Sequence, residues 1–407
     1  MMTTDAPANG LQIPPPPPPG PWWEGVAARW WAEIVVVAPA WFAARLLVIG
    51  SWVLAATVVQ GLELSPRPNA FDDGLLAWDA AWYRDIVRVG YDGLAAEGLR
   101  FFPLFPFLAS LIEAVTPLRA GASLLLVSNS AALGLSVALR RLVLHETGDD
   151  DLARRAVWLM NLLPPAFVLV WGYSESLMLL LAVACFSALR RERWRSAAMF
   201  GALAALARPL GLFLVVPAAI EVLAVVRSNG DGSIRRLPAA LSATGASTLT
   251  AMGAAVAGPV LGTGAFLGWV WIRYGDPLLP VSTQGEFRGE AVDPITRLVR
   301  GVTDLGGGEA LGDGLHLPWA VGFLVLLIAA WRLLPTSYGA FATVVLIAAL
   351  SADNLNSLQR YGLNAFPLTV AAAHLVADPR LERATLAIGG AGVVALSTLS
   401  MLDAYVP

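Results

Sequence analysis

The stretch that decides the fold class is IVVVAPAWFAARLLVIGSWVLAATVVQ, residues 34–60, in which Arg45 is the one charged residue. A helix of this length exceeds the roughly 30 Å hydrocarbon core of a bilayer. Similar apolar runs recur along all 407 residues, of which 57% are hydrophobic and 14% are charged. A soluble protein carries about 25% charged residues, and the runs do not alternate as in a membrane β-barrel. We therefore expect an all-α polytopic membrane protein.

The apolar runs predict about eleven transmembrane helices in a single domain, residues 33–407. Residues 1–32 form a Pro-rich tail that we expect to be cytoplasmic and disordered, with a docking motif as the alternative. The tail lacks the basic start and cleavage site of a signal peptide. The expected spans are 33–60, 119–144, 156–171, 175–190, 196–226 as two short helices, 238–270, 316–334, 337–352, 361–377 and 384–403.

The distribution of arginine orients these spans, because positive residues are enriched in cytoplasmic loops. The arginine clusters between the spans all fall on one side of the membrane, which we expect to be cytoplasmic. They do so only if residues 101–115 do not cross the membrane. That run is short, and proline breaks its start, so we expect it to be interfacial or re-entrant. The first non-cytoplasmic loop, 61–118, then holds interfacial helices and most of the acids, and the loop 273–315 is a candidate lid.

Composition excludes several other functions. The net charge is −3, every basic residue is arginine, and the one cysteine, Cys185, lies in an apolar run. Nucleic-acid binding, lysine chemistry and a cysteine zinc site are therefore not indicated. The expected partners are membrane lipids.

The stretch AWDAAWYRDIVRVGYD, residues 77–92, is charged and aromatic yet lies between apolar runs. In a helix, Asp79, Trp82 and Tyr83 share one face, and Asp85 is turned away from it. We expect the aromatic face to contact lipid headgroups or a lipid substrate. Asp79 then points into a cavity as a general base whose pKa burial raises. The alternatives are an ordinary interfacial helix, or Asp79 as a helix cap.

A second unusual position is Arg208, which precedes Pro209 in the middle of an apolar run. Non-helical backbone and charge at membrane depth are tolerated where they line a cavity or are buried in protein. We therefore expect the helix to break here and to open a cavity toward the face that carries Asp79.

Several stretches carry a family resemblance, in this order along the chain: Trp78-Asp79-Ala80-Ala81-Trp82-Tyr83, Gly90-Tyr91, Phe101-Phe102-Pro103-Leu104-Phe105-Pro106, Gly172-Tyr173-Ser174-Glu175-Ser176, Ala207-Arg208-Pro209-Leu210-Gly211, Tyr274-Gly275-Asp276-Pro277-Leu278, and Arg360-Tyr361 with Phe366-Pro367. Over roughly residues 40–370 they resemble the PIG-V family of mannosyltransferases, which has bacterial relatives. The resemblance implies a GT-C glycosyltransferase fold, a polyprenyl-phosphate sugar donor and a catalytic acid in the first non-cytoplasmic loop. It thus adds this donor and a lipid or glycan acceptor to the expected partners. The eukaryotic members have His-Phe where this chain has Trp82-Tyr83, which leaves the acceptor open.

The resemblance implies roles for particular residues. Asp79 is the general base of an inverting transfer, and Arg208, Arg360 and Tyr361 hold the donor phosphate, because arginine can donate two N–H groups to phosphate oxygens. The alternatives are that Arg208 pairs with Glu175 and that Arg360 is a boundary anchor. Further substrate-binding candidates are Trp78, Trp82, Tyr83, Glu175, Arg273 and Arg288.

No cofactor is required by this chemistry. Asp72 and Asp73 could ligate Mg²⁺ or Mn²⁺, although such a pair is more often a turn or helix cap. The alternative function is a transporter or flippase for a lipid-linked or anionic substrate, because an intramembrane arginine and a broken helix also suit a transport pathway.

Overall fold

The computed structural model describes residues 22–228, 245–289, 292–307 and 316–407. Every regular element within these residues is a helix, which confirms the all-α prediction. The α-helices are α1 (Trp22–Gly61), α2 (Asn69–Asp73), α3 (Asp79–Val89), α4 (Leu104–Val115), α5 (Ala120–Thr147), α6 (Asp150–Leu162), α7 (Glu175–Leu189), α8 (Trp194–Ala207), α9 (Val215–Ser228), α11 (Ala246–Tyr274), α12 (Leu279–Arg288), α13 (Pro294–Gly306), α14 (Leu317–Leu333), α15 (Thr336–Leu350), α16 (Leu358–Asn364), α17 (Phe366–Leu375) and α18 (Pro379–Met401). The 3₁₀ helices are η1 (Gly74–Leu76), η2 (Tyr91–Gly93), η3 (Ala96–Arg100), η4 (Pro164–Leu169) and η5 (Pro209–Leu214).

Five helical stretches in the described chain are long and apolar enough to cross a membrane. Five shorter apolar helices accompany them, and one of these is α4, in the run that we expected not to cross. The chain is thus a polytopic membrane protein, and the count of eleven spans stays a prediction. The long stretches are Trp30–Gly61, Ala120–Thr147, Pro209–Ser228, Ala246–Tyr274 and Pro379–Met401.

Three segments differ from the sequence expectation. Helix α1 begins at Trp22, inside the segment 1–32 that we expected to be a tail, and residues 1–21 lie outside the described chain. The run 156–171 is a helix only to Leu162, because the two prolines that follow cannot donate the next helical hydrogen bonds. The run 361–377 is divided into α16 and α17 ahead of Pro367 for the same reason. The expected lid contains α12 and α13, and its residues 308–315 lie outside the described chain.

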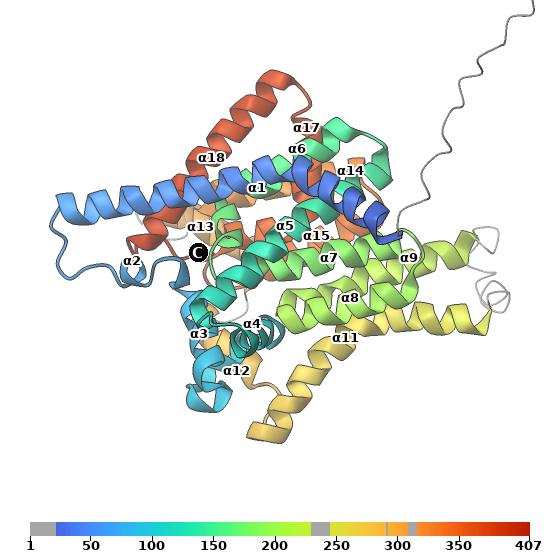
Figure 1. Cartoon of the computed structure of the whole chain (residues 1–407), viewed down its shortest axis with the longest axis horizontal. Helices are drawn as coiled ribbons and strands as arrows, with labels where there is room; N and C mark the ends of the chain where they lie inside the picture. Colours follow the sequence, from blue (N-terminus) through green and yellow to red (C-terminus); the bar gives the residue numbers. More distant parts are fainter. Residues whose placement is uncertain (1–21, 229–244, 290–291, 308–315) are drawn as a thin grey trace, which may run out of the picture.

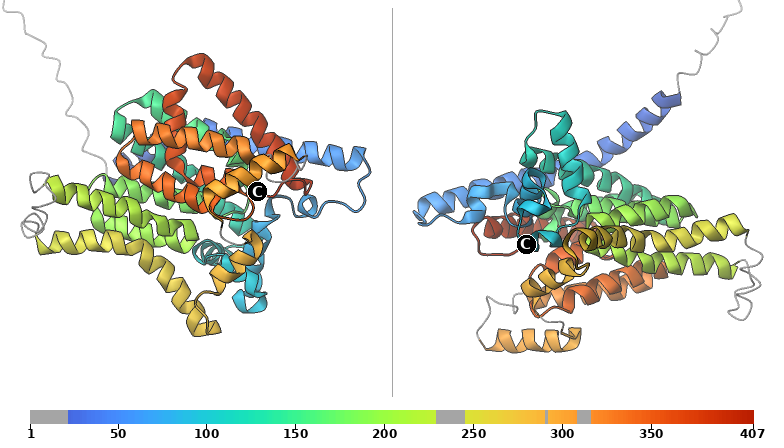
Figure 2. Two further views of the ribbon diagram at one scale, coloured as in Figure 1. Left: turned by 180° about the vertical axis from the view of Figure 1, so that it is seen from behind. Right: turned by 90° about the horizontal axis from the view of Figure 1, so that it is seen from below.

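The long helices form a bundle with two unlike ends (Figure 1). Helices α7, α8 and α9 lie side by side along the long axis, and α11 packs against α8. The end of α9 and the start of α11 mark one end of the bundle, whereas the short helices α2, α3 and α12 gather at the other. The two further views in Figure 2 show the same separation. The end with α2, α3 and α12 is also where the candidate site residues meet.

Small residues allow α8 and α11 to pack backbone to backbone. A Cβ atom on Gly258 would lie 2.4 Å from the carbonyl oxygen of Ala198, and one on Gly262 would lie 2.2 Å from that of Ala202. Such spacing of small residues is typical of helix pairs in membranes, where van der Waals contact replaces the hydrophobic effect. The contact holds α8, and therefore Arg208 after its end, against a helix that is long enough to span the membrane.

The helix break predicted at Arg208 is present. Helix α8 ends at Ala207, and Arg208 is extended (φ −158°, ψ 152°), as a residue before proline prefers. The chain then folds back tightly in η5. A Cβ atom on Gly211 would lie 2.2 Å from the backbone carbon of Ala204. Proline and glycine together therefore direct Arg208 out of the helix.

Gly211→Ala should destabilise the protein by about 1–3 kcal/mol, because the new methyl group must displace backbone. The measurement is thermal unfolding of the purified protein in detergent. Gly253→Ala is the matched control, since nothing lies within 4 Å of a Cβ atom at that helical position. Equal melting temperatures for the two variants would contradict the close contact.

Candidate active site

Asp79 is the first residue of α3, and a constrained backbone turn presents it. The preceding residue, Trp78, has a positive φ of 58°, which is rare for a residue other than glycine. The indole Nε1 of Trp78 donates to the carbonyl of Ser400 at 3.0 Å. No side-chain cap bond closes α3. Asp79 is therefore not a helix cap, and its carboxylate is directed elsewhere.

The carboxylate of Asp79 forms an ion pair with Arg360. Nη1 of Arg360 lies 2.5 Å from Oδ2 of Asp79, although the two residues are 281 positions apart. Burial by itself would raise the pKa of Asp79, as the sequence analysis assumed. The positive charges of Arg360 and then of Arg208 outweigh burial and hold the pKa below its ordinary value of 3.8. In the free protein Asp79 is thus an ionised and weakly basic carboxylate.

Glu175 joins Arg360 to a second arginine. Its side chain is fully buried at the start of α7, and Oε1 pairs with Nη1 of Arg208 and lies 3.3 Å from Nε of Arg360. The alternative prediction, an ion pair between Arg208 and Glu175, is therefore present in the structure. A buried carboxylate is tolerated here because two cations face it. The network links four segments: the start of α3, the start of α7, the residue after α8, and helix α16.

A hydroxyl pair extends the network toward α3. The hydroxyl groups of Tyr83 and Ser174 are 2.7 Å apart, and Nη1 of Arg208 donates to Oγ of Ser174 at 3.3 Å. Burial raises the pKa of Tyr83. Tyr83 therefore remains a neutral phenol that holds Ser174 in place.

Four residues of the site were not among the predicted site residues: Ser174, described above, and Tyr173, Ser357 and Arg100. The guanidinium of Arg360 lies 5.6 Å from the ring centre of Tyr173, and its Nη2 donates to Oγ of Ser357 at 3.3 Å. Arg100 is close enough for its charge to lower the pKa of Asp79. Its guanidinium carbon lies 5.2 Å from the ring centre of Phe101. Tyr173 lies in a stretch that carries the family resemblance, but no local pattern marks Arg100 or Ser357.

Positive charge gathers around Asp79. The buried Glu175 contacts Arg208 and Arg360, and Arg360 also pairs with Asp79. The charge of Arg100 acts on the same carboxylate. Guanidinium groups in a largely buried site favour an anion as ligand, and a phosphodiester is such an anion.

Tyr83, on the aromatic face of α3, is buried in the protein and does not contact lipid headgroups or a lipid substrate as we expected. Tyr83 is only 2% exposed, and its ring packs edge-on against Phe101 and Phe105 at 5.0 and 4.9 Å. Trp82 is partly buried and stacks on Phe101 at 5.8 Å. The expectation failed because α3 packs against α4 and α5, so this face belongs to the protein core.

Arg273 and Asp73 lie outside the ion-pair network. Arg273 is half exposed and pairs with Asp92 at 2.5 Å. Asp73 pairs with Arg84 at 2.9 Å, and within the described chain no three His, Cys, Asp or Glu side chains gather as a metal site would require. Tyr361 follows Arg360 in α16 and contributes, after Asp79 and Glu175, to the interactions that raise the pKa of Arg360. Arg288 is the last residue of α12, and its side chain lies outside the described part of the structure.

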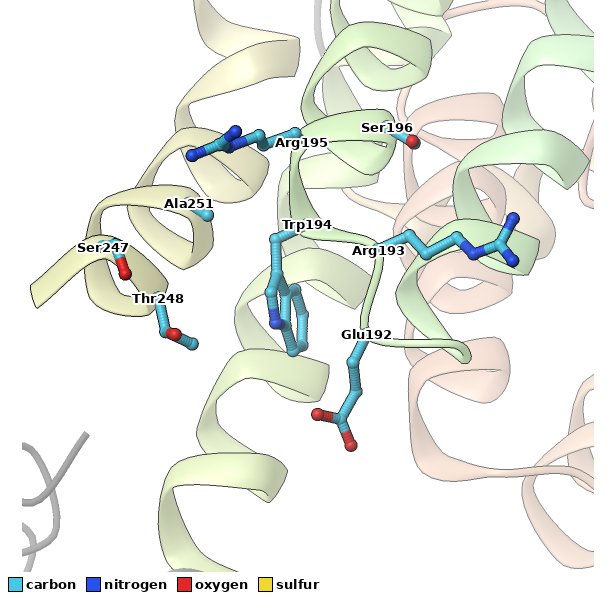
Figure 3. A pocket seen from close by; sticks show the side chains of 8 residues that line it. All are labelled: Glu192, Arg193, Trp194, Arg195, Ser196, Ser247, Thr248 and Ala251. Atoms are coloured by element: carbon cyan, nitrogen blue, oxygen red, sulfur yellow. The ribbon is translucent and has the colours of Figure 1, made fainter. Parts of the chain in front are cut away.

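A separate hollow lies at the other end of α8. It measures about 320 Å³ and is formed by residues 192–196, with Ser247, Thr248 and Ala251 of α11 (Figure 3). Helix α8 has 14 residues, which places its two ends about 20 Å apart. This hollow therefore contains no residue of the ion-pair network.

Residues 65–225 match the family model of the mannosyltransferases (PIG-V). The resemblance found in the sequence is thus confirmed. A comparison with curated proteins found no match. The match and the apolar helices together indicate a membrane protein with glycosyltransferase activity.

The PIG-V match covers most of the network but not all of it. Asp79, Arg100, Glu175 and Arg208 fall inside the matched residues, and Arg360 falls outside them. The fold brings Arg360 to the matched part through its two ion pairs. The site is therefore completed by the last quarter of the chain, outside the matched residues.

Glu175→Gln should destabilise the protein by about 3–5 kcal/mol, because it leaves a buried arginine charge uncompensated. Thermal unfolding in detergent measures the effect. Asp92→Asn removes one partner of the exposed Arg273 pair and is the control, with little change expected. A Glu175 variant as stable as the Asp92 variant would show that the buried pairs are not structural.

Proposed function

We propose that the protein moves a mannosyl unit from a polyprenyl-phosphate donor to an acceptor hydroxyl, with Asp79 as general base. One observation supports this proposal most. Oδ2 of Asp79 pairs with Arg360, whereas Oδ1 accepts no hydrogen bond from the described residues, and the side chain is 27% exposed. Glu175 is fully buried and cannot reach an acceptor. Asp79 therefore combines an anchored oxygen with a free one.

The proposed reaction is a single displacement. The acceptor hydroxyl gives its proton to Oδ1 of Asp79 while its oxygen bonds to the anomeric carbon of the sugar. The bond between that carbon and the donor phosphate oxygen breaks, and the electron pair leaves with the phosphate. Attack from the face opposite the phosphate inverts the anomeric configuration. One base suffices, because no covalent enzyme intermediate forms.

The guanidinium groups of Arg208 and Arg360 suit the leaving group. The donor is a phosphodiester with one negative charge, and the departing polyprenyl phosphate gains a second. Arg208 and Arg360 are positioned by buried acids, so they can face the growing charge without reorganisation. Arginine can hold a single phosphate in this way, and the proposal therefore includes no metal.

Donor binding should also activate Asp79. Arg360 is the main charge that holds the pKa of Asp79 low. A phosphate on Arg360 cancels part of that charge, and the remaining burial then raises the pKa. A higher pKa makes the carboxylate a better base. The base is thus strengthened when the donor is present.

An apolar hollow beside η1 can take the prenyl chain of the donor. It measures about 410 Å³, and Leu75 of η1 forms one wall, four residues before Asp79. Arg45 also lies on it, but its guanidinium donates to Asn129 and to the Leu169 carbonyl at 2.9 and 3.2 Å. The other apolar walls are Val48, Ile49, Trp52, Leu125 and Val170.

We place the network on the non-cytoplasmic side, with the N-terminus cytoplasmic. Arginines 190, 191, 193 and 195 follow α7, and Glu175 begins it. The 15 residues of α7 span about 22 Å, less than the roughly 30 Å core. The site is therefore recessed below the outer surface. Transport, the alternative function, is less favoured because the charges meet at helix ends rather than at a midplane site between repeats.

Asp79→Asn should lower the transfer rate by about 10²–10⁴-fold, because the amide cannot take the acceptor proton. The assay uses purified protein with a synthetic mannosyl polyprenyl phosphate and membrane glycolipid acceptors. Asp85→Asn is the matched control on the same helix, where Asp85 is 41% exposed and lies 3.6 Å from Arg84. Transfer by the Asp79 variant within a few-fold of wild type would exclude Asp79 as the base.

The acid limb of kcat should lie at a higher pH than the acid limb of kcat/KM. A base is lost as the pH falls through its pKa; kcat/KM reports the free enzyme and kcat reports the donor complex. In the free enzyme the pKa of Asp79 is below 3.8, so kcat/KM should stay level down to that pH. Full pH profiles of both constants test this order. Coincident limbs would argue against activation by the donor.

A further inference from the structure

Helix α18 packs against α1, α6 and η4. Near its start, Glu382 accepts two hydrogen bonds from Arg154, at 2.7 and 3.1 Å. Further along, a Cβ atom on Gly389 would lie 2.5 Å from the carbonyl oxygen of Leu162, and one on Gly392 would lie 2.5 Å from the side-chain Cγ of Pro164. Such close contacts leave little freedom to slide. The residues at its far end are therefore fixed relative to α6 and η4.

The residues at that far end, 400–407, are hydrogen-bonded to the segment that leads to Asp79. Oδ2 and Oδ1 of Asp403 accept from the backbone N–H groups of Asn69 and Ala70, at 2.8 and 3.2 Å. These are free donors of the first turn of α2, which Asp403 caps from a distant part of the chain. The carbonyl of Ser400 accepts from Trp78, the residue before Asp79. Figure 1 shows the end of the chain close to α2 and α3.

The same residues are hydrogen-bonded to the segment that carries Arg360. Oγ of Ser357 donates to the carbonyl of Pro407 at 2.6 Å and accepts from Nη2 of Arg360 at 3.3 Å. The hydroxyl of Tyr405 donates to Oε1 of Gln359 at 2.9 Å. Ser357 itself has a positive φ of 64°. These contacts hold a strained turn one residue before α16.

We propose that residues 400–407 form a clasp that positions Asp79 and Arg360 against each other. The inference rests on the proposed function, because it assigns these residues to the placement of the base and of a phosphate ligand. None of the contacts of the clasp described above reaches the two charged groups except through Trp78 and Ser357, so its residues are positioning residues. Placement matters, because a 1 Å error at a reacting centre can lower a rate by about 10²-fold.

The test compares two aspartates that cap helices. Asp403→Ala should lower kcat/KM at least 10-fold and move its acid limb to higher pH, because loosening α2 separates Asp79 from Arg360 and the pKa of Asp79 is then lowered less. Asp403→Asn should restore most of the activity, since the amide oxygen still accepts an N–H. Tyr405→Phe, a milder change, should shift the limb in the same direction.

Asp378→Ala is the control, because Asp378 caps α18 through Arg380 and Leu381 N–H groups far from the site. It should lower thermal stability but leave kcat/KM and the acid limb unchanged.

Two outcomes separate the clasp from the proposed reaction. If the wild type transfers sugar and Asp403→Ala behaves like Asp378→Ala, the clasp is wrong and the reaction stands. If the wild type transfers nothing, the proposed function fails, and the pKa of Asp79 still tests the clasp. The pKa of Asp79 is read from the difference in unfolding free energy between a protein with Asp79 and the same protein with Asp79→Asn, measured as the pH falls. This comparison is made for the wild type and for Asp403→Ala. The contribution of Asp79 is present above 3.8 and is lost as the pH falls through the folded pKa. That loss should begin at higher pH in Asp403→Ala, and an unchanged onset would overturn the clasp.

Discussion

The interaction on which the structure depends is the buried network in which Arg360 contacts both Asp79 and Glu175, and Glu175 contacts Arg208. Charges are rarely buried in an apolar helical protein unless they are paired, because desolvation of a single ion costs several kcal/mol. Each of these side chains therefore needs the others in place. The network thereby fixes the relative positions of four segments that are distant in sequence, and it concentrates positive charge beside one partly exposed carboxylate.

Breaks in the helices present these side chains. Arg208 follows the end of α8 because Pro209 favours an extended residue before it. Trp78 and Ser357, which precede α3 and α16, both have positive φ angles and both are hydrogen-bonded to residues 400–407. Strained backbone persists only where the surrounding structure holds it, and it is common at functional sites. The site is thus formed at the starts and ends of helices. There the backbone can direct a side chain independently of the faces of the helix.

The pairing of acids with arginines also changes how the acid can work. The sequence led us to expect a base whose pKa burial raises, whereas Arg360 and Arg208 lower it. In the reaction that we propose, the ion pair of the free protein and a competing phosphate in the donor complex give the same carboxylate two different basicities. The proposed control needs both Asp79 and Arg360, because neither residue could provide it alone.

The sequence by itself determined that the chain is helical and membrane-embedded, because hydropathy is a local property that every apolar run expresses independently. It also indicated the break at Arg208, since proline acts on its neighbours. The motifs that carry the family resemblance identified Asp79, Arg208, Arg360 and Glu175 as candidate site residues. It could not show that Arg273 pairs with Asp92 away from the site, that Arg100 faces Asp79, or that Asp403 caps α2. Those facts depend on contacts across tens to hundreds of residues, and such contacts are decided only when the helices pack.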